Sequence, residues 1–222
     1  MAKSTPPKDS KSEDTATIIT KAVGGVRGLV DSTLPALVFL IWWTITKDVA
    51  GASIAALGVG GVIAIWRLIR KEPMTQVLSG FFGVGIAAFI AWRSGNAANY
   101  FLPGLLINIG YLVAFLTANL LRRPLAGYLV GVFFGNKYEL ARDWRSHVSV
   151  RRGCEAVGWV WVSVFASRIL VQGSLYLADD VELLGVARVA MGWPLFLLAM
   201  WLSYRILAPR VRGQIKSSEN LG

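Results

Sequence analysis

The chain has 222 residues, of which 55% are hydrophobic and only 16% are charged, and its formal net charge is +10. Soluble domains carry about 25% charged residues, so this composition favours a membrane protein. Because the Lys and Arg residues cluster at the ends of apolar segments and form no single basic face, we expect anionic lipid headgroups at the cytoplasmic surface as partners, and no nucleic acid.

Residues 1–28 are polar at the start and weakly amphipathic at the end, so we predict a disordered cytoplasmic tail followed by a short lead-in. The region 29–207 contains six apolar segments, each near the length that a membrane-spanning helix needs. We therefore predict an all-α, polytopic membrane domain of six transmembrane helices, with spans at 29–46, 49–69, 77–93, 102–121, 157–177 and 183–207. The second span carries small residues four apart, at Ala52, Ala56, Gly60 and Ala64, which predicts close packing against a neighbouring helix.

The segment after the fourth span differs from the others. Residues 102–121 carry no charge and stop at Arg122-Arg123-Pro124, where two cations and a helix-breaking residue mark the membrane surface. The apolar run 125–135 is too short to cross a bilayer, and residues 136–152 place a few apolar side chains on one face among charges. We predict that the segment 125–152 is interfacial or re-entrant.

The distribution of basic residues predicts the orientation. Six spans with both termini inside place 19 Lys and Arg residues on the cytoplasmic side and two, Lys47 and Arg93, on the other. The basic and polar residues 208–222 are predicted to be a frayed cytoplasmic tail. The predicted location is the plasma membrane, crossed several times, with both termini in the cytoplasm.

Arg168 is the sharpest functional signal because it lies near the middle of the fifth span. A central arginine costs about 2.5–3.5 kcal/mol on insertion scales, so its side chain must face protein or water. Asn108 and Tyr111 lie at a matching depth on the fourth span, three residues apart, and we expect one of them or a helix carbonyl to be its partner. Its role is either structural or that of an anion-binding, headgroup-binding or transport residue.

Asp31 and Arg188 are secondary candidates. Asp31 lies at the inner end of the first span, where it would cap the helix or serve as an ion or proton site. Arg188 lies near the outer end of the last span, and we expect it to reach the acidic residues of the connector 179–182. A pore-lining role for Arg188 is the alternative.

No arrangement of residues indicates catalysis. The chain has one cysteine, Cys154, and one histidine, His147, which excludes an internal disulfide and a cluster of Cys or His metal ligands. The sequence shows no nucleophile beside a base, and the GVGG run at 58–61 lies within a predicted span, where glycines serve packing. We expect no enzymatic activity and no bound cofactor or metal.

Several short motifs are similar to those of one protein family. They are VDSTLP at 30–35, WRL at 66–68, FLPG at 101–104 with Asn108, RRPL at 122–125 with Gly127, and GWPL at 192–195. Together they resemble an actinobacterial family of uncharacterised integral-membrane proteins, described as similar to intracellular septation protein A, over residues 25–208. This resemblance implies little about activity, and the septation comparison implies a role in envelope or division-site assembly.

Two functions fit this sequence. The first is a non-enzymatic scaffold of the envelope or division site, which acts through helix packing with further copies of itself or with envelope proteins. The alternative is a small-solute or ion transporter or channel built around Arg168. A cavity that reaches Arg168 favours transport, and a dry, hydrogen-bonded Arg168 favours the scaffold.

Overall fold

The computed structural model describes the backbone of residues 25–72, 74–127 and 148–219, and the side chains in these ranges except those of 25–32, 74–76, 212 and 214–219. Within these ranges the chain is helical and contains no β-strand, which confirms the all-α fold class. The helices are α2 (Gly25–Thr46), α3 (Val49–Ile69), α4 (Met74–Ser94), the 3₁₀-helix η1 (Ala97–Tyr100), α5 (Leu102–Leu120), α8 (Val148–Leu177), α9 (Val181–Ala190) and α10 (Trp193–Glu219).

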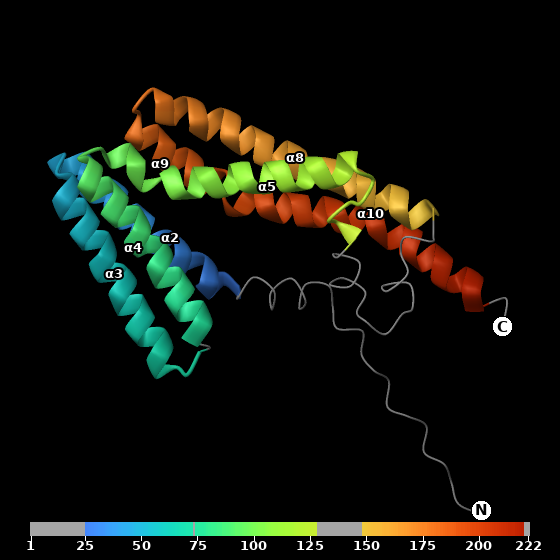
Figure 1. The fold of residues 1–222 in the computed structure, drawn as a ribbon. Coiled ribbons are helices and arrows are strands. Elements are labelled where there is room, and N and C mark those ends of the chain that lie inside the picture. Colours follow the sequence, from blue (N-terminus) through green and yellow to red (C-terminus); the bar gives the residue numbers. More distant parts are fainter. Residues whose placement is uncertain (1–24, 73, 128–147, 220–222) are drawn as a thin grey trace, which may run out of the picture.

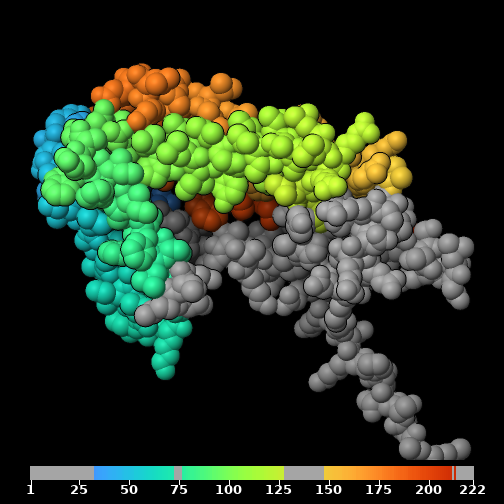
Figure 2. All heavy atoms as spheres, in the orientation of Figure 1, coloured from blue at the N-terminus to red at the C-terminus, as the bar shows by residue number. Residues whose placement is uncertain are grey.

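The helices form two groups (Figure 1). In the first group α3 packs against α2 and α4, and in the second group α8 packs against α5 and α10. The short helix α9 joins the groups, because it contacts α2 of the first and both α8 and α10 of the second. The two groups diverge from the end where α9 lies, and the space-filling view shows α5 and α8 in contact along the edge of the second group (Figure 2).

Five stretches are long and apolar enough to cross a membrane. They are Val49–Ile69, Val77–Ser94, Leu102–Leu120, Val148–Leu177 and Val181–Val211. The first predicted span corresponds to α2, whose described apolar part, Thr33–Thr46, is shorter. The chain is therefore a multi-pass, all-α membrane protein, and the count of six spans stays a prediction.

Two helices extend beyond the ends that the sequence predicts. Helix α8 begins at Val148, so residues 148–152 belong to this long helix, whereas residues 128–147 of the predicted interfacial segment lie outside the described ranges. Helix α10 continues to Glu219, so residues 208–219 are not a frayed tail. The physical reason is that Leu207 and Val211 are fully buried, and the Arg210 stem lies over Gly153 of α8, so packing extends the helix beyond the apolar run.

The small-residue face of α3 is confirmed except at Ala64, which is only half-buried. Ala52, Ala56 and Gly60 are all buried in this helix. A methyl group added at Gly60 would lie 3.4 Å from Cγ1 of Val84, so the side chains of α4 pack directly over this face of α3. This close packing aligns α3 and α4 as a hairpin.

The connections 47–48, 95–101 and 178–180 lie together at one end of the molecule, which we call the connection end. Three side-chain hydrogen bonds join them across long sequence separations: Lys47 Nζ to Glu182 Oε1 at 2.7 Å, Asn96 Nδ2 to Asp179 Oδ1 at 3.0 Å, and Tyr176 Oη to Asn99 Oδ1 at 2.5 Å. The helices therefore alternate in direction, as the predicted topology requires.

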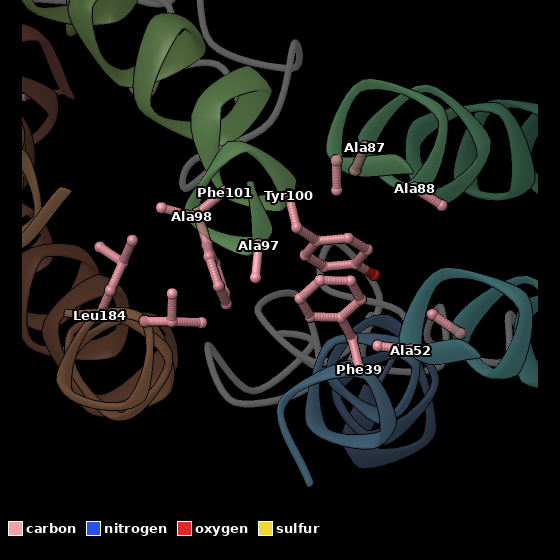
Figure 3. Close-up of a cluster of buried hydrophobic side chains, with 12 residues drawn as sticks. Phe39, Ala52, Ala87, Ala88, Ala97, Ala98, Tyr100, Phe101 and Leu184 are labelled. Carbon is pink, nitrogen blue, oxygen red and sulfur yellow. The ribbon is translucent and has the colours of Figure 1, made fainter. Parts of the chain in front are cut away.

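An aromatic cluster of Phe39, Tyr100 and Phe101 fills the core beneath this end (Figure 3). Phe39 of α2 stacks on Tyr100 with ring centroids 4.0 Å apart, and Phe101 meets Phe39 edge-on at 6.3 Å. Burial raises the pKa of Tyr100 to about 12, and the charge of Arg188 opposes part of this rise. Tyr100 is therefore neutral at physiological pH and packs as an apolar residue.

Candidate functional site

A cavity of about 250 Å³ lies where the two helix groups meet, between α2, α5, α8, α9 and the start of α10. Its polar lining residues are Thr33, Asn108, Arg168, Gln172 and Arg188, and its remaining lining residues are apolar or glycine. No Asp or Glu of the described residues lines it. We call it the arginine cavity.

Arg168 enters the cavity from α8. Its Nη2 donates a hydrogen bond to the Gly192 carbonyl at 2.5 Å, whereas its buried Nε has no hydrogen-bond partner among the described residues. The Gly192 carbonyl is accessible because the chain breaks between α9 and α10 at residues 191–192. Of the expected partners, a helix carbonyl therefore binds Arg168, but one of its donor groups stays free.

Arg188 enters from α9, on the opposite side of the helix break. Its guanidinium carbon lies 5.5 Å from the centroid of the Phe101 ring, within cation–π range. It also lies against the backbone of α5, where a methyl group added at Gly104 would be 2.6 Å from its Nη1. Among the described residues Arg188 makes no ion pair and donates no side-chain hydrogen bond.

The expectation that Arg188 reaches the acidic connector is wrong. Each acidic side chain there has another partner: Asp179 accepts from Asn96, Asp180 from the backbone N–H of Leu183, and Glu182 from Lys47. The physical reason is that α9 is a separate short helix, so Arg188 on its last turn faces the cavity instead of the surface. The structure thus supports the alternative placement, in which Arg188 lines an internal space.

Asn108 and Tyr111 lie in different surroundings, although both are on α5. Asn108 lines the cavity, and its Nδ2 donates to the Gly104 carbonyl at 2.8 Å. Tyr111 is 52% exposed and stacks on Phe165, with ring centroids 5.3 Å apart. Three residues along a helix turn the side chain by about 60° relative to the first, which is enough to carry Tyr111 out of the site.

Gln172 is a site residue that the sequence reasoning missed. It lies on α8 four residues after Arg168, lines the cavity and is only 6% exposed. It forms no side-chain hydrogen bond with the part of the chain that the structure describes. Its spacing from Arg168 on one helical face was the signal that could have identified it.

Asp31 belongs to α2, which begins at Gly25, so its predicted role as a helix cap is wrong. A capping residue must precede the helix, whereas Asp31 lies inside it. Its side chain lies outside the described ones. The proposal of an ion or proton site there stays a prediction.

Comparison with known families addresses the identity of the chain. Residues 23–214 match the family described as "Protein of unknown function (DUF3159)". No curated protein and no solved structure matches the chain. An actinobacterial source and a likeness to septation protein A stay predictions. Because the match covers far more than half of the sequence, this multi-pass membrane protein belongs to the DUF3159 family of proteins of unknown function.

Proposed function

We propose that this protein is a membrane transporter or channel for a small anion, with the arginine cavity as its substrate site. The observation that carries the proposal is that Arg168 and Arg188, from two different helices, line one cavity whose described lining contains no carboxylate. This proposal favours the transporter over the scaffold among the two functions that fit the sequence, and it involves no catalysis.

The electrostatics of the cavity support anion binding. Two guanidinium groups in a medium of low dielectric constant repel each other, and each loses hydration when it leaves water. Arg168 recovers one hydrogen bond to Gly192, whereas Arg188 has only a ring contact with Phe101. An anion between them offsets the repulsion and accepts their free N–H groups.

The interrupted helix at the site also supports transport. The stretch Val181–Val211 is long and apolar enough to cross a membrane, but it is split into α9 and α10. Gly192 and Trp193, at the break, both line the cavity. Transporters commonly build their substrate sites from such broken helices, because the break exposes backbone groups within the membrane.

The proposed location is the plasma membrane with both termini in the cytoplasm. It is supported by the separation of basic residues: Lys47 and Arg93 are at the connection end, and the opposite ends of α3 and α5 carry Arg67, Arg70, Lys71, Arg122 and Arg123. The rule that basic residues concentrate on the inside then puts the connection end outside. We also propose that the basic end contacts anionic headgroups.

The test is anion flux into liposomes that contain the purified full chain. We expect the parent to transport an anion, and we expect Arg188→Leu to reduce this flux by about 10- to 100-fold, since a charge-assisted hydrogen bond contributes roughly that factor. We expect Arg168→Leu to reduce the flux to a similar extent. Arg205→Leu is the matched control, because Arg205 is exposed on α10 and packs on Trp201 outside the cavity.

A parent without flux of any tested anion, or arginine variants that are folded and fully active, would overturn the proposal. The scaffold then becomes the leading candidate, and the hydrogen bond from Arg168 to Gly192 is the observation that favours it. In that case both arginines are structural, and their replacement lowers stability alone.

A further inference from the structure

We infer that the arginine cavity recognises a phosphate group with a hydroxyl on it or next to it, either hydrogen phosphate itself or the phosphodiester of a hydroxylated lipid headgroup. This inference rests on the proposed function, because it names the class of anion that the same site takes. It depends on two amide side chains of the cavity, Asn108 and Gln172, because binding of an anion by the two arginines alone would not require them.

The positive side of the site comes from Arg168 and Arg188. Arginine presents several N–H groups in one plane, a geometry that suits the oxygens of phosphates and carboxylates. The buried Nε of Arg168 has no partner among the described residues, and one Nη is bound to Gly192. The cavity thus offers guanidinium donors from two directions, α8 and α9.

Asn108 adds a hydrogen-bond acceptor beside these donors. One N–H of its Nδ2 is bound to the Gly104 carbonyl at 2.8 Å, so its second N–H and its carbonyl oxygen Oδ1 are left for a ligand, and Oδ1 is the acceptor that the arginines lack. Gly104 is also the residue against which the Arg188 guanidinium lies. An acceptor and a guanidinium therefore meet the ligand at the same place on α5.

Gln172 supplies a second amide. Its side chain is only 6% exposed, lines the cavity and donates no hydrogen bond to the described residues. Because the side chain lines the cavity, a ligand that both accepts and donates hydrogen bonds pairs with its amide. Gln172 lies one helical turn from Arg168, so both side chains reach the same ligand.

Common anions differ in whether they carry a proton at neutral pH. Chloride, nitrate, sulfate and carboxylates have no O–H, so they leave the oxygen of Asn108 unpaired against a negative charge. Hydrogen phosphate carries its own O–H, and a glycerol headgroup carries hydroxyls next to its phosphate. The apolar wall of the cavity, which includes Leu37, Leu40 and Val189, accommodates either source.

The first experiment compares inorganic phosphate with sulfate, which has the same tetrahedral shape. The full chain is placed in phosphatidylcholine nanodiscs, and both anions are titrated at pH 7 by calorimetry. We expect phosphate to bind at least about tenfold more tightly than sulfate, and Asn108→Leu to remove this preference between the two anions. Thr117→Val on α5 is the control, since Thr117 bonds only its own helix at Val113, outside the cavity.

The second experiment tests the lipid source by native mass spectrometry. Phosphatidylglycerol and phosphatidylmethanol are both anionic phosphodiesters, but only the first carries free hydroxyls. Retention of phosphatidylglycerol over phosphatidylmethanol, lost in Asn108→Leu and Gln172→Leu, supports a headgroup ligand. A preference seen only with inorganic phosphate supports the free anion.

The outcomes separate the two proposals. Equal binding of phosphate and sulfate, together with no preference between the two lipids, overturns the inference. If Arg188→Leu abolishes that unselective binding, the proposed anion site stands. If no binding depends on Arg188 or Arg168, the proposed function itself fails.

Discussion

Gly104 determines where the guanidinium of Arg188 can lie. Its missing side chain leaves the space that Nη1 of Arg188 occupies, because an added methyl group would be only 2.6 Å away. Such a contact is far shorter than a normal van der Waals separation, so the arginine must move. Replacing Gly104 by alanine therefore moves the guanidinium without changing the charge of the site.

We therefore predict that Gly104→Ala lowers the affinity of the cavity for its anion by about tenfold or more, measured by calorimetry in nanodiscs. Gly110→Ala on the same helix is the control, since nothing lies within 4 Å of a methyl group there. Helix propensity favours alanine at both positions by about 1 kcal/mol, so a loss of affinity at Gly104 alone reflects the displaced arginine. Equal affinities in the two variants would contradict this role.

At the scale of single residues, the sequence identified both arginines and included a helix carbonyl among the partners expected for Arg168, but it paired Arg188 with the wrong groups. The depth of Arg168 follows from its position in an apolar run, and depth alone predicted Asn108 as a neighbour, which does line the same cavity. Which carbonyl binds Arg168 could not be predicted, because backbone acceptors carry no sequence signal. The surface position predicted for Arg188 requires a continuous last span, whereas the helix is interrupted at residues 191–192.

The packing of α5 on α8 depends on a polar contact between helices. Asn119 of α5 is buried and donates from Nδ2 to the Glu155 carbonyl of α8 at 3.0 Å. Its Oδ1 lies directly over Gly158, where any side chain would collide with it. A glycine in α8 thus permits an interhelical hydrogen bond.

We predict that Gly158→Ala destabilises the protein by about 1–3 kcal/mol, because the methyl group forces Asn119 out of its site. The control is Gly173→Ala in the same helix, where the space is open and stability should be equal or slightly higher. Unfolding in a detergent titration measures both. A Gly158→Ala protein as stable as the Gly173→Ala protein would show that the contact is dispensable.

At the scale of helices, the length of the apolar runs predicted the positions of the helices well, but it did not predict where the helices end. The second predicted span, 49–69, coincides with α3, and the small-residue spacing identified its buried face. By contrast, α8 and α10 extend beyond their apolar runs into charged sequence. Charged residues such as Lys, Arg and Glu favour helix almost as well as leucine, so composition marks the edge of the membrane and not the end of the helix.

The topology of the whole chain can be tested with cysteines. Cys154 is buried, so the parent should give little background with a membrane-impermeant maleimide. We predict that Ser94→Cys, exposed at the connection end, labels in intact cells, and that Arg123→Cys, exposed at the opposite end, labels only after the membrane is opened. The reverse pattern would invert the proposed orientation and place the basic end outside.

The sequence alone determined that this protein is a helical membrane protein and which stretches form most of its membrane-spanning helices. It also determined how the basic residues divide between the two ends of these helices. These properties depend on the local balance between apolar residues and charge, which can be counted along the chain. Arg168 and Arg188 were identified in the same way, as charged residues within apolar runs.

Only the tertiary structure decided that Arg168 and Arg188 share a cavity with Asn108 and Gln172. The break at residues 191–192 redirects α9, and the divergence of the two helix groups leaves space where they meet. Both depend on how helices distant in sequence pack against one another. Apolar periodicity specifies which stretches enter the membrane, but within a uniform apolar medium it does not specify which faces meet.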